Sequence, residues 1–233
     1  MTEILLMIVA FVGGWIGWTL AEYVLHRFAM HALGGKGIMS REHLEHHVTS
    51  SWSFDPVILL AWAGIFLVGC AVWIPLTRLA GASWPVAASV AVGWGVGYFF
   101  HARAHLVPPT GTYSTWLRRH HFHHHFGHPM ANHGVSVMWW DRVFRTLERP
   151  DTVRVPRRLA LPWLVDESGE LLSEFADDYR LVGSAEAGDR DQAARTRLQA
   201  GMLEAEILGV AAAAGTDQHV VAVEHRPGLQ EQG

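Results

Sequence analysis

The sequence contains little cysteine and few charged residues. Among 233 residues there is a single cysteine, and only 17% are Asp, Glu, Lys or Arg. One cysteine cannot form an intramolecular disulfide, which excludes a disulfide scaffold. No basic stretch is interleaved with aromatic residues, which disfavours nucleic-acid binding. The sequence also lacks a phosphate-binding glycine loop and a nucleophile elbow, so the usual signatures of nucleotide binding and serine hydrolysis are missing.

Three apolar runs dominate the first hundred residues. Residues 4–25 include a single charge, Glu22, and residues 56–74 and 85–100 include none. About 20 apolar residues suffice to cross a bilayer. The third run is short, so we expect it to pair with the second as a tilted hairpin closed by residues 75–83. The pattern predicts an all-α integral membrane bundle of about three transmembrane helices, capped by further helices.

Three crossings would place residues 26–55 and everything after residue 100 on one side of the membrane. Those segments carry twelve of the thirteen Lys and Arg residues found up to Arg158, and the opposite side carries only Arg78. Cytoplasmic loops carry an excess of Lys and Arg. We therefore expect that side to be cytoplasmic, in a bacterial inner membrane, with residue 1 outside and residue 233 inside.

The charge balance changes near residue 150. Residues 1–150 hold 10 Lys+Arg against 7 Asp+Glu, whereas residues 151–233 hold 8 against 15. The apolar runs also stop there. We predict a membrane-embedded domain over residues 1–150 and an acidic, weakly structured cytoplasmic tail over residues 151–233, with one helix over residues 192–214.

Histidine is the residue in excess, and fourteen of the sixteen histidines fall between His26 and His133. They form four groups, namely His26 and His31; His43, His46 and His47; His101 and His105; and His120, His121, His123, His124 and His125. Positions i, i+3 and i+4 share one face of an α-helix. The second group therefore predicts a tridentate patch and the third a bidentate one. The fourth allows two tridentate registers, either His121, His124 and His125 or His120, His123 and His124.

The first histidine group fits a regular helix less well, because positions i and i+5 differ by about 140°. Either its two histidines serve different metals or the helix ends between them. We expect Glu22, one turn earlier, to hydrogen-bond the imidazole of His26. The histidines outside the groups, His128, His133, His219 and His225, are expected at the surface.

The ligand count indicates the kind of site. Neutral imidazole binds zinc, copper, iron and nickel. Two, three, two and three histidines sum to ten ligands, which is more than one ion takes and suits two. A site without cysteine argues against structural zinc. A histidine-rich membrane protein for metal binding or transport is the alternative, but transport would call for ionisable residues within the spans, and residues 56–74 and 85–100 have none.

At these histidines the sequence resembles the fatty acid hydroxylase and sterol desaturase superfamily of integral membrane di-iron enzymes. Over roughly residues 20–150 the groups follow that family's order of His-x4-His, His-x2-His-His, His-x3-His and His-x2-His-His. The segment GVSVMWWDRVFRTLE is similar to the family's Trp-Asp segment, and GTYSTWLRRHHFHHHF resembles the approach to the last group in fatty acid 2-hydroxylases.

The resemblance implies that residues 1–150 are a fatty acid hydroxylase-like catalytic domain with two irons, for which zinc can substitute. Such a site uses O₂ to abstract hydrogen from a lipid C–H bond, most simply in a fatty acyl chain, and hydroxylates or desaturates it. Because no cytochrome segment is present, electrons would come from a separate donor, such as a ferredoxin or a cytochrome with its reductase. Carotenoid ring hydroxylation is the alternative. The third histidine group of those enzymes resembles His-x4-His, whereas HARAH has three intervening residues, which favours the fatty acid hydroxylases.

The resemblance also implies a ligand set. The pair His124 and His125 followed by Phe126 matches the family's last group and selects the later register. Asp141, in the Trp-Asp pair, is expected to hold a hydrogen bond that supports a metal ligand or the structure, rather than to act in catalysis. Carried over group by group, the implied metal ligands are His26, His31, His43, His46, His47, His101, His105, His121, His124 and His125.

Overall fold

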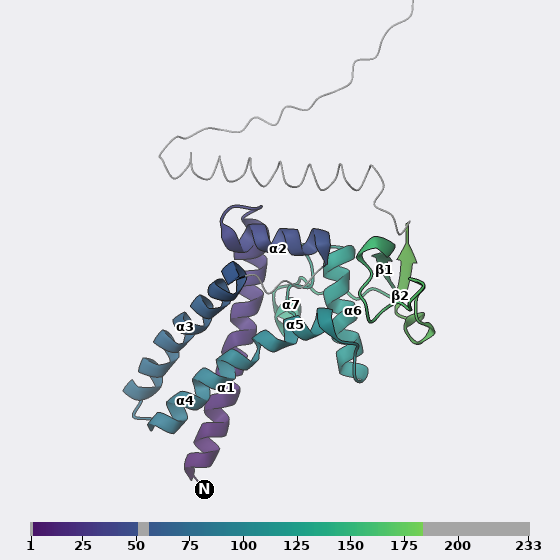
Figure 1. The fold of residues 1–233 in the computed structure, drawn as a ribbon. Helices are drawn as coiled ribbons and strands as arrows, with labels where there is room; N and C mark the ends of the chain where they lie inside the picture. Colours follow the sequence, from purple (N-terminus) through teal and green to yellow (C-terminus); the bar gives the residue numbers. More distant parts are fainter. Residues whose placement is uncertain (1, 51–55, 184–233) are drawn as a thin grey trace, which may run out of the picture.

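The computed structural model describes residues 2–50 and 56–183, and this part of the chain is mostly helical (Figure 1). The predicted all-α architecture is confirmed in this coarse form, and the structure adds one small parallel sheet that the sequence analysis did not predict. The elements are α1 (Thr2–Val24), the π-helix η1 (Leu25–Ala32), α2 (Ile38–Thr49), α3 (Pro56–Leu79), α4 (Trp84–Val96), α5 (Tyr98–Leu106), α6 (Thr112–Phe126), α7 (Trp139–Val143), β1 (Val153–Pro156), the short 3₁₀ helices η2 (Arg157–Leu159) and η3 (Ser173–Phe175), and β2 (Tyr179–Val182).

Two helical runs, Thr2–Ala32 and Leu59–Leu79, are long and apolar enough to cross a membrane. The predicted third run is divided instead, because α4 ends at Val96 and α5 begins at Tyr98. With 13 residues, α4 is only about 20 Å long, against a hydrocarbon core of about 30 Å. The third crossing therefore stays a prediction.

Glycines allow α1 and α4 to pack with their backbones in contact. A Cβ on Gly14 would lie 2.0 Å from the carbonyl oxygen of Val90, and one on Gly93 would lie 2.0 Å from that of Phe11. Small residues permit this close approach between helices in lipid. The two helices also start at the same end, where Ser83 Oγ donates to Glu3 Oε1 at 2.7 Å. The hairpin of α3 and α4 thus returns the chain to the end at which α1 finishes (Figure 1).

At that end, residues 151–183 pack against α6. Strands β1 and β2 pair in parallel, with Val153 opposite Tyr179, and their buried side chains form a core with Phe122 of α6 and with Trp163 and Leu164. The sequence predicted a weakly structured tail for this region. They are ordered because their apolar side chains have a hydrophobic face of α6 to cover. The predicted helix over residues 192–214 lies outside the described residues.

Candidate metal centre

The first two histidines lie on the π-helix η1, which continues α1 without a break. In a π-helix the hydrogen bonds join residues five apart, which brings i and i+5 onto one face. The ring centroids of His26 and His31 are accordingly 5.1 Å apart. Both alternatives drawn from a regular helix are therefore wrong: the helix does not end between the two residues, and both enter the same cluster.

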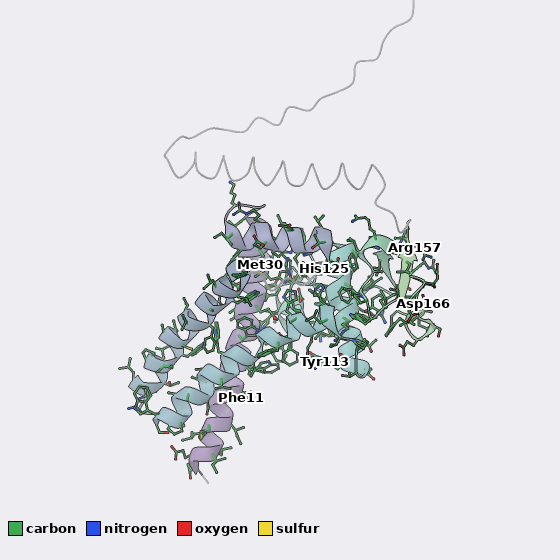
Figure 2. All side chains as sticks on the ribbon, in the orientation of Figure 1. Phe11, Met30, Tyr113, His125, Arg157 and Asp166 are labelled. Atoms are coloured by element: carbon green, nitrogen blue, oxygen red, sulfur yellow. The ribbon has the colours of Figure 1, made fainter. Side chains whose placement is uncertain are left out.

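Ten histidines gather into two clusters, and within each cluster one nitrogen from every ring lies within 4.8 Å of the others. The first cluster comprises His26, His31, His43, His47 and His124. The second cluster comprises His46, His101, His105, His121 and His125. The structure thus brings together all ten residues of the implied ligand set. Figure 2 shows His125 on α6, where that helix meets α2.

The two clusters are built to one plan. The first takes a pair from η1, a pair from α2 and a single histidine, His124, from α6. The second takes a pair from α5, a pair from α6 and a single histidine, His46, from α2. The predicted tridentate patches are therefore each divided between clusters. On a helix i and i+4 are about 40° apart, whereas i+3 lies about 60° away on the other side, so the i+3 residue of each patch faces the neighbouring cluster.

Close nitrogen–nitrogen contacts in the first cluster are more numerous than hydrogen bonding explains. Nε2 of His43 lies 2.9 Å from Nε2 of His26, 2.9 Å from that of His31 and 3.1 Å from that of His47. A neutral imidazole nitrogen either donates one hydrogen bond or accepts one. Three such neighbours around one nitrogen are the arrangement expected when several lone pairs converge on a shared cation.

The second cluster shows the same spacing. Nε2 of His105 lies 3.1 Å from Nε2 of His46 and 2.9 Å from that of His121. With metal–nitrogen bonds of about 2.0–2.1 Å, two imidazole nitrogens at right angles around one ion are about 3 Å apart. The donor sets of both clusters therefore fit a transition-metal ion.

The clusters lie side by side. The rings of His47 and His125, one from each cluster, stack with centroids 4.1 Å apart and planes 12° apart. His121 and His124 are parallel neighbours at 6.2 Å. Two ions in these clusters would be held close together by adjacent turns of α2 and α6.

Burial keeps these imidazoles neutral. It lowers the pKa of His43, His121 and His124 well below the usual value, and neighbouring imidazoles lower it further. The same causes lower the pKa of His105 and His125. Since only the neutral ring offers a lone pair, the environment prepares both clusters for metal rather than for protons.

Backbone carbonyls set the tautomer of two rings in the first cluster. Nδ1 of His26 donates to the carbonyl of His133 at 2.5 Å, and Nδ1 of His124 donates to that of Ala131 at 2.7 Å. A carbonyl can only accept, so each Nδ1 carries the proton and each Nε2 presents its lone pair. The segment 131–136, here called the carbonyl loop, thereby orients a ligand from η1 and a ligand from α6.

Two expectations about this region are wrong. Glu22 is not hydrogen-bonded to His26; its carboxylate accepts hydrogen bonds from the backbone N–H groups of Val135 and Ser136. His133 is not a surface residue: it is fully buried, with its ring 5.4–5.7 Å from those of His26, His31 and His124. No sequence signal pointed to either contact, since the partners are distant along the chain or use only backbone atoms.

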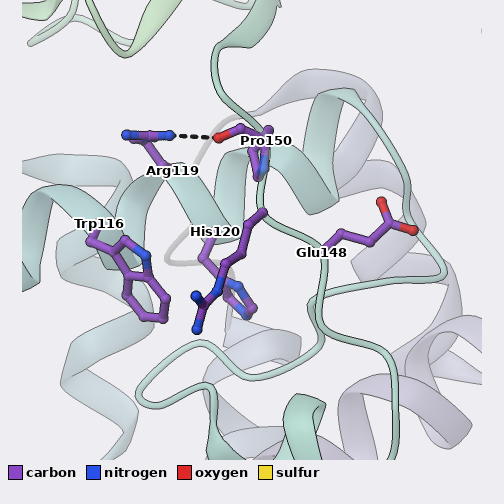
Figure 3. Close-up of a pocket in the computed structure, with 6 residues that line it drawn as sticks. Trp116, Arg119, His120, Glu148 and Pro150 are labelled. Carbon is purple, nitrogen blue, oxygen red and sulfur yellow. Dashed lines mark hydrogen bonds between the residues drawn. The ribbon is translucent and has the colours of Figure 1, made fainter.

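His120 and His123, the two histidines used only by the earlier register, lie outside both clusters. His120 Nε2 donates to Asp141 Oδ2 at 3.1 Å, and His123 pairs with Glu148 at 2.7 Å. Glu148 also pairs with the exposed His128. A pocket of about 20 Å³ adjoins His120 (Figure 3), and it is lined by Trp116, Arg119, His120, Glu148, Arg149 and Pro150. It has room for one or two waters. His219 and His225 lie outside the described residues.

Comparison with known proteins identifies relatives of this chain. The family model described as fatty acid hydroxylase matches residues 11–146. Human fatty acid 2-hydroxylase is 30% identical over 150 residues, covering 57% of this chain and 38% of the human protein. Dihydroceramide fatty acyl 2-hydroxylase FAH1 of Arabidopsis thaliana is 30% identical over 148 residues, covering 60% of each.

A yeast relative, the ceramide very long chain fatty acid hydroxylase SCS7 of Saccharomyces cerevisiae, is 30% identical over 146 residues, covering 58% of this chain and 36% of the yeast protein. The matched region thus spans between 36% and 60% of the length of these relatives. No solved structure matches the chain at a significant level. Because the family model covers more than half of the sequence, the chain belongs to the fatty acid hydroxylase family.

Proposed function

We propose that this protein is a membrane-bound non-haem di-iron oxidoreductase that hydroxylates a lipid, most simply a fatty acyl chain. One observation carries the proposal: two adjacent clusters of five buried histidines, in the first of which a single imidazole nitrogen has three others within 3.1 Å. Three of the relatives are named for hydroxylation of fatty acids or ceramides.

The ligands in this proposal are the ten clustered histidines, five for each ion. Imidazole ligands without cysteine are compatible with iron, and zinc can occupy the same donors. When bound, a pair of irons supplies the activation of O₂ that an unreactive C–H bond requires. Hydroxylation of R–H consumes one O₂, two electrons and two protons, and it yields R–OH and water. The electrons come from a separate donor, such as a ferredoxin or a cytochrome with its reductase.

The chain's own residues hold and shield the site. The carbonyl loop fixes the tautomers of His26 and His124, and burial keeps the imidazoles neutral. The clusters lie at the end of α1 and η1, whose apolar side chains, such as Ile8, Val12 and Ile16, are exposed along the helix. Such a surface suits lipid, which would bring an acyl chain to the edge of the clusters.

We assign catalysis to residues 1–150 and propose that residues 151–183 support it through their packing on α6. The arginine asymmetry of the sequence supports a cytoplasmic location for the clusters and the C-terminal end, in a bacterial inner membrane. Reporter fusions at residues 1 and 233 test this orientation, and reporters on the same side would overturn it.

Lipid mass spectrometry tests the activity. Membranes from cells with and without the chain should differ by lipids that gain one oxygen, and this gain should require O₂. A loss of two hydrogens would indicate desaturation instead, and oxygen gained on a carotenoid ring would transfer the activity to the alternative substrate class.

The matched control is the double variant His46→Ala His124→Ala, which removes one implied ligand from each cluster. It should show no new lipid at equal expression. An active double variant would refute the enzyme assignment, and a wild-type chain that binds metal but changes no lipid would favour a metal-binding or transport protein.

A further inference from the structure

The carbonyl loop is held from two sides by buried carboxylates. Asp141 on α7 accepts the backbone N–H of His133 at 2.7 Å and that of Gly134 at 2.8 Å. Glu22 on α1 accepts the N–H of Ser136 at 2.8 Å and its hydroxyl at 2.8 Å. Both carboxylates are buried. The N–H of Val135 also donates to Glu22, so five hydrogen bonds to these carboxylates fix a segment with no regular secondary structure.

The loop sequence is adapted to this arrangement. A Cβ on Gly134 would lie 2.1 Å from the carbonyl oxygen of Val137 and 2.8 Å from Asp141 Oδ2. Only glycine therefore lets the carboxylate reach two successive N–H groups. Asn132 adopts a positive φ of 57°, a conformation that asparagine tolerates better than most residues. Its side chain accepts from the N–H of Glu148 at 2.7 Å.

The other face of the loop holds the ligands. The carbonyl of His133 accepts from His26, and that of Ala131 accepts from His124. His133 therefore links a carboxylate to a clustered imidazole through its own peptide groups: its N–H donates to Asp141, and its C=O accepts from Nδ1 of His26. A shift of this loop changes both ring orientations at once.

We propose that Asp141 and Glu22 are positioning residues for the first cluster, which act through the carbonyl loop to hold His26 and His124 in their ligating tautomer and orientation. This inference rests on the proposed function. It goes beyond it by giving the two carboxylates a role in one cluster and not in the other. Within the described part of the chain, Nδ1 of His121 and of His125 in the second cluster has no hydrogen-bond partner, so neither ring depends on the loop.

Replacement of Asp141 by asparagine removes the acceptor from one of two N–H groups. Oδ1 faces the N–H of His133 and Oδ2 faces that of Gly134, so either orientation of the amide places an NH₂ group against a donor. A buried donor left unpaired is destabilising, so the loop must move. Loss of such an outer hydrogen bond typically lowers metal affinity by about 10–100-fold.

The test uses full-length protein in detergent, stripped of metal and titrated with Co²⁺, whose visible absorption reports its coordination. One background, His101→Ala His125→Ala, leaves only the first cluster complete. The other, His31→Ala His47→Ala, leaves only the second. Asp141→Asn should weaken Co²⁺ binding by about 10–100-fold in the first background and change its spectrum. In the second background the Kd should change less than about threefold.

The matched control is Trp140→Phe, at the residue next to Asp141. It removes the bond from Trp140 Nε1 to Thr19 Oγ1, which ties α7 to α1 without touching the loop. This variant should leave both Kd values unchanged. Glu22→Gln, at the opposite end of the loop, should shift the first background in the same direction as Asp141→Asn, and it carries the test if that variant does not fold.

The outcomes separate this inference from the proposed function. Equal weakening in both backgrounds, or weakening by Trp140→Phe as large as that by Asp141→Asn, would show general loosening and overturn the positioning role. Unchanged Kd values in both carboxylate variants would overturn it as well, while the di-metal proposal stands. Failure of either background to bind Co²⁺ would overturn the proposed function together with this inference.

Discussion

The two clusters have the same number of histidines but are held in different ways. In the first, Nδ1 of His26 and of His124 is fixed by a carbonyl of the loop 131–136. In the second, Nδ1 of His121 and of His125 has no partner within the described residues. The first cluster is thus oriented at the rings, through hydrogen bonds that act directly on the ligating side chain.

The second cluster is held through the main chain of α5, which carries two of its histidines. Trp163 Nε1 donates to the carbonyl of His105 at 3.2 Å. Arg118 Nη2 donates to the carbonyl of Arg103 at 2.9 Å and to that of Val107 at 2.8 Å. These bonds hold the end of α5, where the carbonyl of Arg103 also accepts the N–H of Val107.

The difference indicates that the two clusters rely on supports from different parts of the chain. The first depends on α1, α7 and a short loop. The second depends on α6 and on residues 151–183, which supply Trp163. Variants that touch one support should therefore separate the clusters.

The largest effect is expected from the ligands themselves. His46→Ala acts on the second cluster and His124→Ala on the first, and each removes a nitrogen from the middle of its group. Each should lower lipid oxidation at least about 100-fold, because both clusters are required, and each should lose metal only from its own cluster. Metal analysis combined with lipid mass spectrometry measures both, and His219→Ala should keep two ions and activity. If either ligand variant retained full activity, the two clusters would not form one site.

A large effect on stability is expected from Trp163→Ala. The side chain is buried with Phe122, Phe175 and Tyr179, so truncation should lower the free energy of unfolding by about 3–5 kcal/mol. Metal should be lost preferentially from the second cluster, because the carbonyl of His105 loses its donor. Denaturant unfolding and metal analysis check this.

Trp163→Phe is the matched variant, since it keeps an aromatic ring in the core but removes the Nε1–H donor together with part of the indole. Its cost should be about 1–3 kcal/mol. If Trp163→Ala weakened both clusters equally, residues 151–183 would stabilise the whole domain and not the second cluster in particular.

A smaller effect is expected from Arg118→Met. The change keeps an unbranched side chain but removes the guanidinium donors to the carbonyls of Arg103 and Val107, of which that of Arg103 keeps the N–H of Val107. The loss should cost about 1–3 kcal/mol. The affinity of the second cluster for Co²⁺ should fall, while that of the first stays constant. The control is Arg119→Met, one residue along α6, whose part-exposed pair with Asp178 is worth about 1 kcal/mol or less. Equal losses in both clusters would contradict the division of supports.

The sequence predicted the members of the clusters but not their grouping. Helical periodicity is local, so it could predict pairs such as His101 and His105, which share a face wherever their helix lies. It left two registers open in the last group, and the choice of His121, His124 and His125 came from the family resemblance. The division of His46 from His43 could not be found, because it depends on the directions from which η1, α5 and α6 approach α2. The π-helix at His26 was not predicted either, since the geometry of a regular α-helix places i and i+5 on different faces.

The residues that support the clusters could not be predicted for a related reason. Glu22 meets Ser136 across 114 positions, and the groups that hold His26 and His124 are backbone carbonyls, which every residue has. The small core within residues 151–183 was not predicted, because the acidic composition of the segment outweighs a few apolar side chains, such as Val155 and Leu164, that are fully buried against α6.

The smallest effect is expected from His120→Ala, which compares the two registers of the last histidine group on one helix. His120 bonds Asp141 Oδ2, but that oxygen keeps the N–H of Gly134, and Oδ1 keeps the N–H of His133 and the hydroxyl of Thr146. The variant should therefore retain both ions and most of the activity, with a loss of first-cluster affinity below about tenfold, since one of several bonds to the carboxylate is gone. His125→Ala, five residues along α6, should lose the second-cluster ion and turnover. Metal content and product formation of the two variants measure this difference. The opposite pattern, with metal lost in His120→Ala and kept in His125→Ala, would move the ligands to His120, His123 and His124 and dissolve the division into two clusters as the structure draws it.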